Sequence, residues 1–205
     1  MFIHKYGVAM KTMRERELDE LLIAIKSGND ADFAFSELAR RYEPMMQSRV
    51  SSILPEECSR SEGMQEAHIA LLNAAVTYDG KRCEGVTFGL YSSVCVCNAL
   101  RSLARLRRRE SEHTDRLKDE MKIIGGADVE GFVVTRDLCE RVLKAAEETL
   151  TELEYEVFKL QLEGYSTREI AKRLSRGSKS IDNAKSRISK KLKRVDEIRH
   201  ILSDV

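Results

Sequence analysis

Three times along this chain, a Ser or Thr is followed three residues later by a Glu and then by apolar residues at helical spacing. The pairs are Ser59 with Glu62, Thr151 with Glu154, and Ser166 with Glu169. In such a capping box, each side chain satisfies a backbone N–H that the first turn of a helix leaves without a partner. Pro occurs twice in 205 residues and Trp not at all. Repeated helix starts with few helix breakers predict an all-α fold.

Apolar residues at helical spacing predict four helices in the N-terminal part, over 14–26, 32–53, 59–78 and 87–109. Pro44 lies inside the second helix, and we expect a kink or break there because proline lacks the N–H that an inner helical turn needs.

The fourth predicted helix combines Phe88 at its start with a face that carries aromatic, amide and arginine side chains. The residues of that face are Tyr91, Asn98, Arg101, Arg105 and Arg108. Arg suits phosphate, and an aromatic ring suits base stacking, so this face is a candidate site for a nucleic-acid strand. The alternative is a solvated face on an ordinary core helix.

Charge is segregated along the chain, although the net charge is only +1. Residues 101–109 hold five bases and no acid, and residues 110–130 hold seven acids and three bases. Residues 179–194 then hold seven bases and one acid. We therefore predict an N-terminal helical bundle over 1–109, an acidic linker over 110–134 and a C-terminal helix-turn-helix domain over 135–205.

The C-terminal prediction rests on a helix after Ser166, the turn 175–178, and a last helix with an apolar stripe through Ile181 and Ile188. This order is typical of a helix-turn-helix. The opposite face of the last helix carries Lys179, Asn183, Ser186, Arg187, Lys190 and Arg194, and Ser180 is a further candidate DNA contact on this helix. Asn and Ser can contact base edges, while Lys and Arg hold phosphates, which favours DNA binding over a merely solvated basic helix.

Other classes of protein are disfavoured by the sequence. The longest apolar run, 21–25, is far shorter than the roughly 20 residues of a membrane span, and charged residues interrupt the N-terminal stretch too early for a signal peptide. We expect a cytoplasmic chain that does not bind membranes. Its five Cys show no metal-ligand spacing and are expected to be reduced. With no phosphate loop, nucleophile elbow or other catalytic set, we expect neither an enzyme nor a cofactor.

Together these segments resemble bacterial RNA polymerase sigma factors of the sigma-70 family. Gln65-Glu66, followed by Ile69 and Leu71, resembles the family's D-D-L-x-Q-E-G-x-I-G-L helix. Phe88-x-x-Tyr91-Ser92 resembles the start of its helix for the −10 promoter element. Segments 150–174 and 179–187 resemble the domain for the −35 element, with a recognition helix like that of the sigma-H type.

The resemblance implies a small two-domain alternative sigma factor that directs core RNA polymerase to promoters and assists DNA opening. It implies promoter DNA and core polymerase as partners, and an anti-sigma factor as a further candidate partner. It assigns core-polymerase binding to Glu62, Gln65, Glu66 and Ile69. Two alternatives stay open: a stand-alone helix-turn-helix transcriptional regulator, and a polymerase-binding decoy.

Overall fold

The computed structural model describes residues 13–54, 59–82, 85–112 and 129–195. In these ranges the regular structure is entirely helical, which confirms the all-α prediction. The helices are α1 (Met13–Ser27), α2 (Ala31–Ile53), α3 (Arg60–Thr77), α4 (Phe88–Glu112), α5 (Val129–Thr149), α6 (Glu152–Leu162), α7 (Thr167–Arg173) and α8 (Ser178–Leu192).

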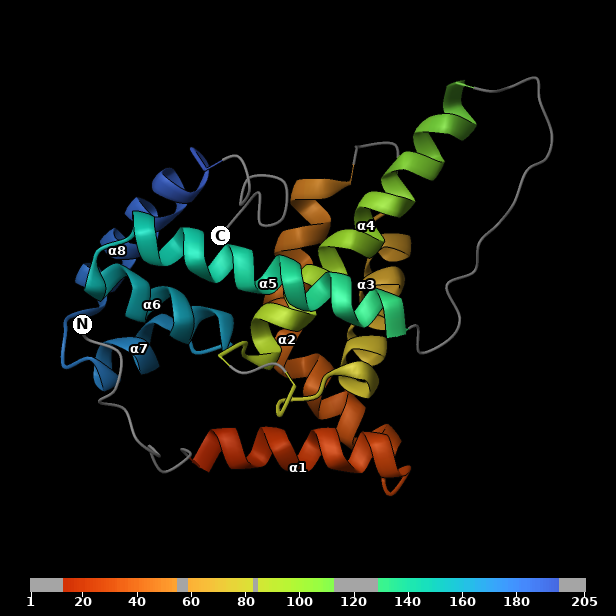
Figure 1. The fold of residues 1–205 in the computed structure, drawn as a ribbon, viewed down its shortest axis with the longest axis horizontal. Coiled ribbons are helices and arrows are strands. Elements are labelled where there is room, and N and C mark those ends of the chain that lie inside the picture. The colour runs from red at the N-terminus through yellow and green to blue at the C-terminus, as the bar shows by residue number, and fades with distance from the viewer. Residues whose placement is uncertain (1–12, 55–58, 83–84, 113–128, 196–205) are drawn as a thin grey trace.

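Helices α1 to α4 form the N-terminal bundle, and α4 is the helix of the bundle that packs on α5 and α6 (Figure 1). Helix α4 packs on α2 and α3 from one side and on α5 and α6 from another. Its first three turns are therefore buried nearly all round, with Leu90, Val94, Val96 and Leu100 inaccessible to solvent. A helix that is covered on several sides shows no single apolar stripe.

Helix α2 runs without interruption through Pro44, so the predicted break is absent. Tyr42 and Met46, on either side of the proline, are 1% and 0% exposed, and their packing holds both halves of the helix in place. Pro44 itself is exposed. Water can therefore hydrogen-bond the Arg40 carbonyl, which loses its usual N–H partner.

Two of the three predicted capping boxes form. Thr151 Oγ1 accepts from the Glu154 N–H at 3.5 Å, while the Glu154 carboxylate accepts from the Thr151 N–H at 3.1 Å. Ser166 and Glu169 make the equivalent pair of bonds. The third box does not form: Ser59 caps α3 without a side-chain hydrogen bond, and Glu62 instead pairs with Arg107 of α4.

The predicted linker is shorter at both ends than expected. Helix α4 continues to Glu112, and α5 begins at Val129, six residues before the predicted domain start at 135. Residues 113–128 lie outside the described residues. Helix α5 packs on α4 and also contacts α6 and α8, so it joins the N-terminal bundle to the C-terminal helices α6–α8 (Figure 1).

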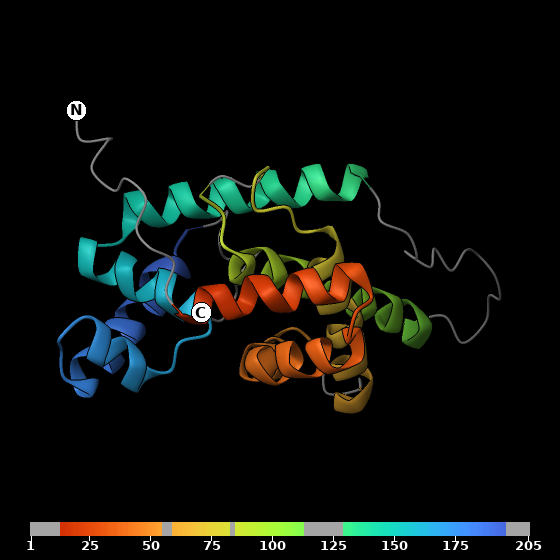
Figure 2. The ribbon, with the colours of Figure 1, turned by 90° about the horizontal axis from the view of Figure 1, so that it is seen from below.

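The N-terminal bundle and the C-terminal helices also touch directly. Gly89, in the first turn of α4, lies against the end of α6, where an added Cβ would be 1.7 Å from the Leu162 carbonyl oxygen. Arg41 of α2 donates to the Glu163 carbonyl at 3.3 Å. The chain is therefore closed on itself, with α6–α8 beside the bundle (Figure 2).

Candidate nucleic-acid interface

Helices α7 and α8 form a helix-turn-helix. Helix α7 ends at Arg173, and Ser175 takes a left-handed φ of 50° that turns the chain toward α8. The Arg176 N–H donates to the Ala171 carbonyl at 2.8 Å and closes this turn. One face of α8 packs on α6 and α7 through fully buried residues. They are Ile181, Ala184 and Ile188.

The other face of α8 is exposed to solvent, as the sequence predicts. Lys179, Asn183, Ser186 and Lys190 share one stripe along the helix, and Ser180 and Arg187 flank it. All six side chains are exposed. The structure therefore brings these six predicted site residues together.

Arg187 also has a partner on the protein side. Its Nε donates to Glu154 Oε1 at 2.9 Å, and Lys191 Nζ donates to Glu154 Oε2 at 2.6 Å. Glu154, on α6, is 2% exposed. Burial by itself would raise the pKa of Glu154, but hydrogen bonds from Lys191, the Thr151 backbone and Arg187 outweigh it and lower the pKa to about 2. This buried carboxylate fixes α8 on α6.

Sequence reasoning missed this role of Glu154. The capping-box spacing explains one set of its bonds, but its two cationic partners lie 33 and 37 residues away. A Glu in the first turn of α6 is already explained by the capping box, so nothing in the sequence indicated its ion pairs with α8.

On α4, the predicted role of the aromatic residues needs correction. Phe88 and Tyr91 are 2% and 1% exposed, so neither presents a ring to a nucleic-acid strand in this conformation. Phe88 packs edge to face against Tyr42 and Tyr78 with ring centroids 5.5 and 5.4 Å apart. The Tyr91 ring lies 5.4 Å from that of Tyr78. These rings form an aromatic core cluster.

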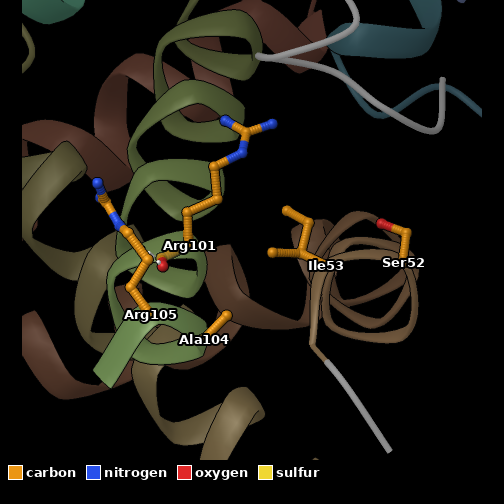
Figure 3. Close-up of a pocket in the computed structure, with 5 residues that line it drawn as sticks. All are labelled: Ser52, Ile53, Arg101, Ala104 and Arg105. Atoms are coloured by element: carbon orange, nitrogen blue, oxygen red, sulfur yellow. Dashed lines mark hydrogen bonds between the residues drawn. The ribbon is translucent and has the colours of Figure 1, made fainter. Parts of the chain in front are cut away.

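The second half of α4 keeps its polar face. Asn98 and Arg101 are half-buried, and Arg105 is exposed. Arg101 and Arg105 line an open pocket of about 440 Å³ with Ser52, Ile53 and Ala104, between α4 and the end of α2 (Figure 3). Burial lowers the pKa of Arg101, and the nearby Arg49 and Arg105 add to that effect. A concave basic surface of this kind suits a phosphate backbone.

Helix α3 carries a separate exposed surface. Gln65 and Ile69 are exposed, as a binding role requires, whereas Glu66 is half-buried and the Glu62 carboxylate is taken by Arg107. The same face continues through Leu72 and Val76, which are 38% and 46% exposed. Leu72 is three residues from Ile69 and four from Val76, which places all three on one face of the helix.

Comparison with known proteins gives two results. Residues 148–200 match the family described as bacterial regulatory proteins, luxR family. The RNA polymerase sigma-H factor of Bacillus licheniformis is 25% identical over 202 residues, covering 89% of this chain and 88% of that protein. The sigma-H factor of Bacillus subtilis (strain 168) is 26% identical over 202 residues, covering 89% of this chain and 90% of its own length. No solved structure matches the chain significantly.

The helix-turn-helix with its exposed polar face, together with the match to bacterial regulatory proteins over 148–200, fits a DNA-binding protein. Similarity to two sigma-H factors over nearly the whole length goes further, and it supports a small sigma factor of the sigma-70 family. Within the described residues, no helix has the length and apolar character needed to cross a membrane.

Proposed function

We propose that this chain is an alternative sigma factor that binds core RNA polymerase through α3 and promoter DNA through α8 and α4. The observation that carries the proposal is the coexistence of two exposed surfaces that the fold itself does not need. One is the exposed face of α3, which runs from Gln65 to Val76, and the other is the polar face of α8. The sigma-H factors of two Bacillus species support both assignments by their similarity along the chain.

In this proposal α8 enters the major groove of the −35 element, with Asn183 at a base edge and Lys179 and Lys190 on phosphates. Arg101 and Arg105 hold the backbone near the −10 element. Phe88 and Tyr91 support α4 from within and take no part in base stacking while they are buried. An anti-sigma factor is a further partner in this proposal, acting on these same surfaces.

Reconstituted transcription tests the function as a whole. The chain is added to core polymerase, and promoter-specific transcripts are measured. Specific transcripts support a working sigma factor. Co-purification with core polymerase without transcripts would indicate a decoy. DNA binding without co-purification would indicate a stand-alone regulator, like the regulatory proteins whose family matches residues 148–200.

The core-binding surface is tested by Ile69→Asp. Ile69 is 54% exposed, so a charge there leaves the fold intact while it puts an ion into an apolar contact with the partner. We expect core affinity to fall at least about tenfold, since losing about 1.4 kcal/mol already has that effect. The matched control is Ile23→Asp on α1, where the side chain is 64% exposed. Equal core binding by both variants would contradict the assignment.

The DNA surface is tested by comparing Asn183→Ala with Lys190→Ala. Loss of a base contact at Asn183 should weaken the binding free energy by about 1–3 kcal/mol and relax the base preference at one position of the −35 element. Loss of the Lys190 charge should weaken binding to all sequences and reduce the salt slope by about one. Binding to a panel of single-base promoter variants at several salt concentrations separates the two. If Asn183→Ala relaxes no position, the base-reading role is wrong.

A further inference from the structure

A second pocket lies where the N-terminal bundle meets the C-terminal helices. This interdomain pocket has a volume of about 410 Å³ and is lined by residues of α2, the start of α4, and the segment from the end of α6 to α8. Its size falls within the range of about 300–1,000 Å³ typical of small-molecule sites. It is separate from the open pocket beside Arg101 and Arg105.

The lining of the interdomain pocket is positively charged. Arg41, Arg49 and Lys185 contribute side chains to it, and none of its lining residues is an Asp or Glu. Lys185 Nζ donates to the Thr167 hydroxyl at 2.9 Å. Burial lowers the pKa of Lys185, while Asp182 acts in the opposite direction. The hydroxyl groups of Ser48 and Ser93 add neutral donors.

Arg49 is the unusual member of this lining. It is 4% exposed, and its guanidinium makes one hydrogen bond, from Nη2 to the Ser93 hydroxyl at 3.3 Å. Its Nε and Nη1 are buried without a hydrogen-bond partner, and no ion pair joins Arg49 to a carboxylate of the described residues. A buried cation in this state is costly unless an anion compensates it.

The neighbouring Gln161 has a buried acceptor atom that lacks a donor. Its Oε1 is buried without a hydrogen-bond partner and lines the same pocket. An amide oxygen accepts hydrogen bonds only, so it calls for a ligand that carries a hydroxyl or N–H group. The pocket therefore favours a negatively charged group near Arg49 and a hydrogen-bond donor near Gln161.

We propose that the interdomain pocket binds a small phosphate monoester that carries hydroxyl groups, such as a sugar phosphate. The phosphate lies among Arg49, Lys185 and the Ser93 hydroxyl, and a ligand hydroxyl donates to Gln161. Guanidinium groups bind phosphate with charge-assisted hydrogen bonds, and the Nε and Nη1 atoms of Arg49 have no partner to which they donate.

The position of the pocket gives such a ligand a regulatory consequence. Its walls come from both the N-terminal bundle and the C-terminal helices, so the complete site exists only while the two are in contact. A ligand that binds one arrangement shifts the equilibrium toward it. The phosphate monoester would therefore hold the chain closed, and by reciprocity any partner that separates the two parts would release it.

The test uses the full chain with ribose 5-phosphate, inorganic phosphate and uncharged ribose as probes, followed by calorimetry and thermal melting. We expect ribose 5-phosphate to bind and to raise the melting temperature in a concentration-dependent way, inorganic phosphate to bind more weakly, and ribose not to bind. A short single-stranded oligonucleotide is included as a fourth probe. If it alone binds and Arg49→Met weakens that binding, the pocket serves a DNA backbone; if it alone binds and Arg49→Met leaves binding unchanged, it binds elsewhere on the chain. Either result overturns the small-molecule proposal.

Arg49→Met distinguishes a ligand site from a structural arginine. It should lower ribose 5-phosphate affinity at least tenfold, and without ligand it should melt at the same temperature as the wild type or higher, because a buried uncompensated charge is gone. Lys185→Gln provides a second variant with the same expected loss of affinity. Arg40→Met, an exposed arginine on the same helix, is the control that keeps full affinity. Unchanged affinity in Arg49→Met, or no binding by the wild type at millimolar concentrations, would overturn the proposal.

Discussion

Glu154→Gln should lower the free energy of unfolding by about 2–3 kcal/mol, the largest loss that we expect from a single conservative substitution. Glu154 is 2% exposed and accepts from Arg187 and Lys191. Glutamine keeps the shape and one acceptor of the capping box but removes the charge that both cations face. Because Arg187 and Lys191 are partly exposed and can be hydrated again, the loss stays at the low end for a broken buried pair.

Glu169→Gln is the matched control for this prediction. Glu169 occupies the same third position of a capping box, on α7, but it is exposed. Neutralising it should cost about 1 kcal/mol or less, the usual size of a capping contribution. Thermal or denaturant unfolding of both variants beside the wild type gives the comparison. Equal losses would show that capping, and not the ion pairs to α8, accounts for the effect of Glu154.

The pH dependence of unfolding gives an independent check on Glu154. Its pKa is about 2 in the folded chain against an ordinary value of 4.5. A lowered folded pKa means that the carboxylate stabilises the fold fully above about pH 4.5, and that this contribution is lost as the pH falls toward 2. The difference in stability between wild type and Glu154→Gln should therefore narrow over this range. A difference that stays constant from pH 6 to pH 3 would contradict the lowered pKa.

Local signals in the sequence were sufficient for most helices and for the face of α8. Capping boxes depend on residues three apart, and the apolar stripe of α8 depends on residues up to seven apart, so neither needs knowledge of the tertiary fold. The start at Met13 and the end at Ser27 of α1 lie within one residue of the predicted limits. Lys179, Asn183 and Lys190 accordingly share an exposed stripe, as expected.

Features that depend on distant partners could not be predicted in this way. Phe88 and Tyr91 are core residues because α4 is covered by helices from both ends of the chain, and no local period reports that coverage. Glu62 faces Arg107, 45 residues away, instead of closing its capping box. The pairing of Arg187 with Glu154 and the burial of Arg49 depend in the same way on helices brought together only by the fold.

The closed arrangement bears on how the chain can engage a promoter. The −10 and −35 promoter elements are centred about 25 base pairs apart, which corresponds to roughly 85 Å of duplex. A compact chain of 205 residues has a radius of gyration of only about 17 Å. If α4 and α8 bind DNA as proposed, their two faces cannot reach both elements together while α4 and α6 are in contact. The proposed function therefore requires the contact at Gly89 to open before both elements are bound.

Gly89→Ala should open the chain. In the closed arrangement an alanine Cβ would lie 1.7 Å from the Leu162 carbonyl oxygen and 3.2 Å from the Glu163 backbone nitrogen, so the two backbones must move apart. Alanine otherwise favours a helix by about 0.5–1 kcal/mol over glycine, so α4 itself should stay intact. We expect the radius of gyration from small-angle X-ray scattering to rise by several ångströms. We also expect affinity for a promoter with both elements to rise about tenfold, because a competent state that was a minor population becomes the main one.

Two comparisons make the Gly89 prediction specific. Gly80→Ala is the matched control, since its added Cβ would make only ordinary contacts of 3.6 Å or more with Tyr78. Affinity for a short duplex with the −35 element alone should be unchanged in Gly89→Ala, because the α8 face is already exposed in the closed chain. A gain on the short duplex as large as that on the full promoter would show that closure acts by covering α8. An unchanged radius of gyration would show that the contact between α4 and α6 yields locally and does not hold the two parts of the chain together.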